Sequence, residues 1–211
     1  MKKALTLFIL LTSMSFASPR LISNQLEMIV DSINLSSVNQ SLLFDAIDHI
    51  QPNFLINWNI GDRMEYKLSG GGGLLTGTMV KAVTKFEDVG GVKDLGLWLK
   101  QEVSMMGRKE VIEALLNRNT GEILKLLHNG QEQQIPDDKP EIISQEYTSV
   151  TVPAGTFKAL YIVAKTKDVS KLEVWMNPTD TVMEGTLKQI VPTSFLTLTF
   201  ELTQFSAGHG E

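Results

Sequence analysis

The chain has 211 residues, of which 43% are hydrophobic, and its formal net charge is −5. It contains no cysteine, which excludes disulfides, thiolate chemistry and a lipid-modified N-terminal cysteine. An acidic chain is poorly suited to binding nucleic acid or anionic lipid surfaces, and this one is long enough to bury a core without disulfides.

The first residues, MKKALTLFILLTSMSFASPR, have the order of a secretory signal: two lysines, an apolar run over residues 4–11, and small residues near a cleavage point. We predict a signal peptide over residues 1–17. The apolar run is shorter than the roughly 20 residues that a spanning helix needs, so an uncleaved membrane anchor is the less favoured alternative. Cleavage removes two of the 19 basic residues and leaves 17 against 24 acidic ones, a charge of −7. We therefore expect a periplasmic or secreted protein without a stable transmembrane segment.

Residues 18–52 differ from the rest of the chain in their hydrophobic pattern, because their apolar residues recur at helical spacing. The first apolar stripe consists of Ile22, Leu26, Ile29 and Ile33, and the second consists of Leu43, Ile47 and Ile50. Ser36 and Ser37 interrupt the pattern, and Pro52 would end the second stripe. We predict two amphipathic helices, or one broken helix, that pack on the following sheet; a lid or a partner-binding hairpin is the alternative.

Residues 53–205 are predicted to form an antiparallel β domain. Apolar and polar residues alternate most clearly over residues 196–203, which is typical of a strand with one face buried. No helical pattern lies regularly between the strands, which disfavours a parallel sheet. We predict a mainly β fold: a curved antiparallel sheet, half-barrel or clam-like, with about eight to ten strands in a meander and a short N-terminal helical segment.

Turn residues separate the predicted strands. Asn129-Gly130 favours a tight hairpin, because both central positions of such a turn need positive φ. The stretch VTVPAGTFKALYI (residues 150–162) predicts two strands joined at a Pro-Ala-Gly corner, since no acid, base or activated nucleophile accompanies it. KEVIEALL (residues 109–116) would suit a helix, but the turn residues around it favour a strand. Residues 206–211 are expected to form a flexible tail.

No catalytic or metal-binding pattern is recognisable. The glycines of residues 69–73 lack the Lys-Ser/Thr ending that completes a nucleotide-phosphate loop. The histidines at 49, 128 and 209 lie far apart, whereas a zinc site needs three or four converging ligands; His128 is expected at a solvated strand end. There is no Gly-x-Ser-x-Gly elbow, and the paired acids Asp137-Asp138 suit a solvated loop. We predict no catalytic residue, no metal and no cofactor.

Large apolar side chains remain as candidates for a binding site. A curved sheet can leave its concave face partly open, with adaptable methionines and aromatic rings lining a pocket for an acyl chain. The candidate ligand-binding residues are Trp58, Met64, Tyr66, Trp98, Trp175 and Met176. Ordinary core packing is the alternative interpretation of the same residues.

Three segments together resemble a broad, poorly characterised group of exported bacterial β-proteins. They are Gly61-Asp62 with Tyr66, the stretch TVPAGTF (residues 151–157), and VWMNP (residues 174–178) followed by GTLK (residues 185–188). In that group a half-open antiparallel sheet is similar in shape to the β-clam of lipoprotein carriers. The resemblance covers residues 58–205 and implies a periplasmic, non-enzymatic protein; it transfers no catalytic residue.

The sequence therefore favours a periplasmic or secreted binding protein, without enzymatic activity, for an apolar or lipid-like ligand or for an envelope component such as a protein. The alternative is a secreted hydrolase or lyase acting on envelope polymer, which predicts a cleft holding two or more carboxylates, one with a raised pKa. A third hypothesis is a structural module that pairs through an exposed sheet edge.

Overall fold

A computed structural model describes residues 56–135, 140–166, 169–193 and 196–209 of the chain. The predicted signal peptide and the predicted helical segment over residues 18–52 lie outside the described residues, as do His49 and Asp137-Asp138. Within the described part of the chain, no helix is long and apolar enough to cross a membrane.

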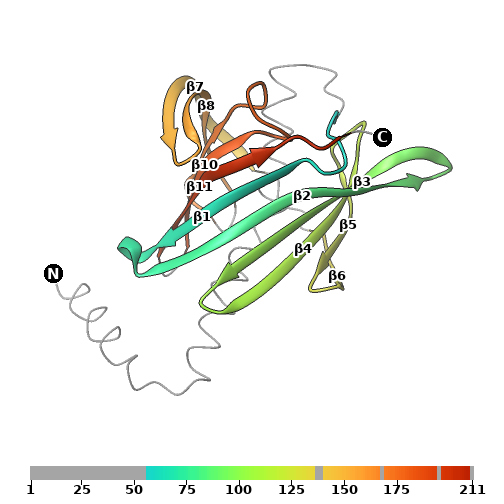
Figure 1. The fold of residues 1–211 in the computed structure, drawn as a ribbon, viewed down its shortest axis with the longest axis horizontal. Helices are drawn as coiled ribbons and strands as arrows, with labels where there is room; N and C mark the ends of the chain where they lie inside the picture. The colour runs from blue at the N-terminus through green and yellow to red at the C-terminus, as the bar shows by residue number, and fades with distance from the viewer. Residues whose placement is uncertain (1–55, 136–139, 167–168, 194–195, 210–211) are drawn as a thin grey trace. The chain divides into compact units, whose positions relative to one another are not determined.

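The described residues form one antiparallel sheet of eleven strands (Figure 1). In chain order the strands are β1 (Arg63–Gly70), β2 (Leu75–Val89), β3 (Val92–Met105), β4 (Arg108–Asn117), β5 (Ile123–His128), β6 (Gln131–Gln133), β7 (Glu141–Val152), β8 (Gly155–Lys165), β9 (Leu172–Met176), β10 (Thr186–Pro192) and β11 (Thr197–Ser206). A short 3-10 turn, η2 (Gly71–Gly73), joins β1 to β2. The mainly β, antiparallel prediction is confirmed.

The strand order is β6-β5-β4-β3-β2-β1-β11-β10-β9-β8-β7, so the sheet of the described residues has two free edges and is not closed. Each half is a meander, and the two halves join where β1 pairs with β11. The prediction of one continuous meander was wrong between β6 and β7, which lie at opposite edges of the sheet. The predicted strand number was too low, partly because a strand as short as β6, with three residues, leaves little alternation to detect.

The predicted turns are found where local chemistry requires them. Asn129 and Gly130 have φ values of 50° and 78° and connect β5 to β6. Gly155, with φ 144°, follows the corner between β7 and β8. The KEVIEALL stretch lies in β4, as the flanking turns predicted. Glycine and asparagine tolerate positive φ at low cost, which explains why these local predictions succeed.

One face of the sheet carries most of the large apolar core. The register places Met64, Tyr66 and Leu68 of β1 beside β11 residues of the same face, and the same alternation continues through β10, β9 and β8. Met64 and Leu68 are each 0% exposed and Tyr66 is 1% exposed. We call this the inner face.

The β7–β8 hairpin reaches back to β11 across the two short strands between them. The Ala154 N–H donates to the Leu202 carbonyl at 3.0 Å, and the rings of Phe157 and Phe205 lie edge to face with centroids 6.5 Å apart. A register shift between Glu65 and Tyr66 in the β1–β11 pairing lies at the level of Leu202. Such a bulge leaves backbone groups outside the ladder, which suits the Leu202 carbonyl to accept the bond from the corner.

Candidate functional site

The six predicted site residues do not come together in one place. Met64, Tyr66 and Met176 share the inner face and are at most 3% exposed. Trp98 and Trp175 alternate with inner-face residues and so point to the opposite face. Trp58 lies before β1 and is 3% exposed. An apolar ligand at the inner-face trio would have to displace packed side chains, so the predicted ligand-binding role stays a prediction.

The two sheet tryptophans have polar partners on their own face. Trp98 is 8% exposed, and its Nε1–H donates to Glu87 at 2.6 Å. Trp175 stacks on Tyr161 with ring centroids 4.6 Å apart, and the Tyr161 hydroxyl donates to Glu173 at 2.5 Å. These contacts hold the two tryptophan rings against polar side chains on the face opposite the inner face.

A buried polar cluster, which the sequence did not indicate, occupies the inner face. Lys81 of β2 forms an ion pair with Glu184, and their side chains are 4% and 1% exposed. The Thr186 hydroxyl donates to the same Glu184 oxygen, Oε1, at 3.2 Å, and the Tyr66 hydroxyl donates to the Thr186 carbonyl at 3.0 Å. We call Tyr66, Lys81, Glu184 and Thr186 the buried cluster. The only signal in the sequence is a lysine at an inward position of β2, between Met79 and Val83.

The charge of Glu184 also acts on Tyr66. Burial raises the pKa of the Tyr66 hydroxyl well above its usual 10.0, and the negative charge of Glu184 raises it further. Tyr66 therefore stays protonated at physiological pH and acts as a hydrogen-bond donor, not as a base. Glu184 Oε2 is buried without a hydrogen-bond partner in the described part of the chain. The cluster holds elements together but offers no exposed reactive group.

Glu184 reaches the inner face because of the connection between β9 and β10, residues 177–185. Asn177 begins it: its Oδ1 accepts the N–H groups of Thr179 and Asp180 at 3.0 and 2.9 Å, and its Nδ2 donates to the Lys158 carbonyl at 2.8 Å. Gly185 ends it with φ 71°, where an added Cβ would lie 2.3 Å from the Asn177 carbonyl carbon. Only glycine fits there, so the sequence itself directs this connection inward.

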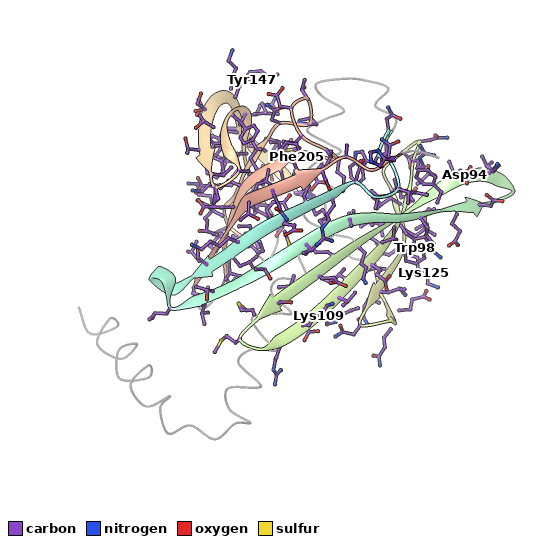
Figure 2. The ribbon with its side chains drawn as sticks, in the orientation of Figure 1. Asp94, Trp98, Lys109, Lys125, Tyr147 and Phe205 are labelled. Atoms are coloured by element: carbon purple, nitrogen blue, oxygen red, sulfur yellow. The ribbon has the colours of Figure 1, made fainter. Side chains whose placement is uncertain are left out.

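β7 forms one edge of the sheet, and most of its residues are exposed. β7 has 12 residues and, among the described strands, pairs only with β8, whereas the opposite edge strand, β6, has three. Tyr147, at 79% exposed, and Ile143, at 54%, extend from it into solvent. Figure 2 shows Tyr147 at the outer margin of the β7–β8 hairpin. Residues 144–152 contain no proline, lysine or arginine.

The hydrolase alternative predicts a cleft with two or more carboxylates, one of them with a raised pKa. Among the described residues, no group of three or more histidine, aspartate or glutamate side chains could hold a metal ion. Lys100 and Lys109 lower the pKa of Glu102 to about 2, the opposite of the raised pKa expected for a general acid. His128 ends β5, the strand end that was predicted, and its Nε2 lies 3.1 Å from Glu110 Oε2.

Comparison with known proteins gives matches in structure only. No family model matches the sequence, and no curated protein matches it. A Bacteroides fragilis protein assigned as exported, with a YmcC-like fold, is 12% identical with a TM-score of 0.40, over 73% of this chain and 99% of that one. A β-barrel-like protein of a domain of unknown function from Brucella abortus is 7% identical, with a TM-score of 0.41 over 72% of this chain and 99% of that one.

MucB is also similar, at 12% identity and a TM-score of 0.38, over 79% of this chain and 60% of MucB. Exported β-sheet proteins without an assigned function, the group that the sequence resembles, are thus among the solved structures similar to this chain.

Proposed function

We propose that this chain is an exported, non-enzymatic binding protein of the cell envelope, which holds an extended segment of another envelope protein at the free edge of β7. The observation that carries the proposal is the length and openness of that edge. An unpaired edge presents a row of free N–H and C=O groups, and proteins normally protect it with lysine, proline or a very short strand. Residues 144–152 have none of these protections, while β6 at the other edge is protected by its shortness.

The side chains of β7 specify the chemistry of the partner. Glu141 and Glu146 are its only charged residues, and Glu146 is exposed on one face. Tyr147 projects from the other face, because side chains alternate along a strand. A complementary strand therefore carries lysine or arginine on one face and apolar residues on the other. Backbone hydrogen bonds would provide affinity, and these alternating side chains would provide specificity.

A second copy of this chain is a poorer occupant than a basic partner. Two copies would bring together two acidic chains whose β7 strands each carry only negative charge. Like charges facing each other across strands destabilise a pair by a few tenths to about 1 kcal/mol. Sedimentation of the purified protein is expected to give a monomer over the concentration range of the binding experiment.

Backbone hydrogen exchange of β7 tests the proposal. A synthetic nine-residue peptide of alternating lysine and valine is expected to slow amide exchange in β7, whereas a glutamate-valine peptide is not. Tyr147→Lys places a cation on the edge and is expected to abolish the effect; Leu74→Lys, at a site 71% exposed on the β1–β2 connection, should leave it intact. Equal protection by both peptides, or protection unaffected by Tyr147→Lys, would show that β7 is not a selective docking edge.

A further inference from the structure

A cavity of about 490 Å³ lies where the start of β3 and the β4–β5 connection meet the residues that precede β1. Its polar lining includes Lys93, Asp94, Arg118 and Asn119, and Ile56 and Leu95 contribute apolar wall. Cavities of a few hundred cubic ångströms with a few converging polar groups are typical of small-molecule sites. The cavity is remote from β7, because strand order places β4 and β5 in the other half of the sheet.

The Arg118 guanidinium is held rigidly in this cavity. Its Cζ lies 4.2 Å from the centroid of the Phe86 ring, and its Nη1 donates to the Asp94 carbonyl at 3.2 Å. The Arg118 backbone is fixed as well: its N–H donates to Leu95 and its carbonyl accepts from Ile56, both at 2.9 Å. A guanidinium fixed in advance loses little freedom when it binds an anion.

Most of the donors of this guanidinium have no partner in the part of the chain that the structure describes. Arginine has five N–H donors, and within the described residues only the Asp94 carbonyl accepts from Arg118. Nε is buried without a hydrogen-bond partner there. Among the described residues, no carboxylate pairs directly with Arg118; Asp94 presents its backbone oxygen to it, while the Asp94 carboxylate lies 4.0 Å from Lys93 Nζ. The charged side chains that line the cavity are two cations and one carboxylate, although the net charge of the whole chain is −5.

We propose that this cavity binds a small molecule through a carboxylate or phosphate group, which Arg118 holds with Lys93 in support. Arginine matches the planar oxygen pairs of such groups, and charge-assisted hydrogen bonds are the stronger kind. Ile56 and Leu95 would contact the apolar remainder of the ligand, so a carboxylate with a short alkyl chain fits better than a bare ion. The site is independent of the proposed docking at β7.

Titration of the whole protein with three probes, followed by NMR shifts of the amides lining the cavity, tests the assignment. Inorganic phosphate, acetate and octanoate distinguish a phosphate site, a bare carboxylate site and a carboxylate site with an apolar wall. Of the two carboxylates, octanoate is expected to bind more tightly than acetate. Absence of saturable shifts with all three probes would overturn the proposal.

Charge variants locate the binding. Arg118→Gln is expected to weaken binding at least tenfold, and Asp94→Asn, which removes the opposing carboxylate, to strengthen it about threefold. Asp94→Asn keeps the test valid if Arg118→Gln fails to fold. Lys109→Gln, near the opposite end of the β3–β4 hairpin from Asp94, removes a cation outside the cavity and is expected to change nothing (Figure 2). Equal weakening by Lys109→Gln, or no effect of Asp94→Asn, would indicate non-specific attraction and refute the site.

Discussion

Asp62 shows how one buried carboxylate organises the start of the sheet. It is 3% exposed, and its two oxygens accept the N–H groups of Asn59 and Gly208, both at 2.8 Å. Its backbone carbonyl also accepts from Val83 at 3.0 Å. Buried carboxylates are tolerated when hydrogen bonds replace their water, and here one bond comes from the neighbouring Asn59 and the other from Gly208, which is distant in the chain.

The contact with Gly208 gives a first prediction, at the residue scale. A Cβ at position 208 would lie 2.1 Å from the Ile60 carbonyl oxygen, so Gly208→Ala must displace backbone. We expect the free energy of unfolding to fall by about 1–3 kcal/mol. Urea unfolding measures it, with exposed Ala207→Ser as the matched control. A flexible tail over residues 206–211, as the sequence suggested, would instead leave Gly208→Ala as stable as the parent.

Single residues also show where sequence reasoning works. Asn129 and Gly130 could be placed in a turn because their conformational preference is local. Glu184 could not be placed, because its burial depends on Lys81, 103 residues away in the chain. Arg118 was missed for the same reason: its stacking on Phe86 follows from strand pairing, which leaves no local pattern.

At the scale of elements, the connection over residues 177–185 acts as an internal brace. It begins at the end of β9 and carries Glu184 to β2, which lies three strands away from β10 in the sheet. The ion pair thus joins the two meander halves a second time, beside the direct pairing of β1 with β11. A buried pair contributes little net stability, yet removing one partner leaves a charge without compensation.

This brace gives a prediction with a built-in control. Lys81→Met is expected to lower the free energy of unfolding by about 3–5 kcal/mol, because Glu184 stays buried and unpaired. The double variant Lys81→Met with Glu184→Leu should recover most of that loss, because both charges are gone. Lys165→Met, which breaks an ion pair 46% and 67% exposed, should cost under about 1 kcal/mol. A double variant as unstable as Lys81→Met would show that the Lys81–Glu184 ion pair itself stabilises the fold, and that the unpaired charge of Glu184 is not the cause of the loss.

Elements were predicted well where alternation was strong and poorly where it was weak. β11 and β8 have distinct apolar patterns, and both are strands. The edge position of β7 was not foreseen, since a sequence pattern specifies which face of a strand is buried but not its neighbours in the sheet. That distinction matters for function, because the proposed docking depends on β7 having a free edge.

For the whole molecule, the seam between the two halves determines how stability responds to pH. Tyr66 lies on β1 at this seam, and its hydroxyl donates to Thr186 of β10. Its folded-state pKa is raised well above 10.0, first by burial and then by the charge of Glu184. Above about pH 10 an unfolded tyrosine loses its proton while Tyr66 in the fold keeps it. The unfolded state then binds fewer protons, so the free energy of unfolding falls as pH rises.

The last prediction follows from that sign. The contribution of Tyr66 is present in full below pH 10 and is lost above it, at about 1.4 kcal/mol per pH unit until its folded pKa is reached. Burial and Glu173 raise the pKa of Tyr161 to about 12. Tyr161 therefore adds a smaller loss of stability between pH 10 and 12, because water screens its partly exposed hydroxyl.

Urea unfolding of the parent and of Tyr66→Phe at pH 8 and pH 11 isolates the contribution of Tyr66, since lysine ionisation is common to both proteins. Between these pH values, the free energy of unfolding of Tyr66→Phe should fall by about 1 kcal/mol less than that of the parent. The corresponding difference between Tyr161→Phe and the parent should be smaller than this. Equal losses in the parent and Tyr66→Phe would mean that Tyr66 ionises within the fold, and that the seam opens before the sheet unfolds.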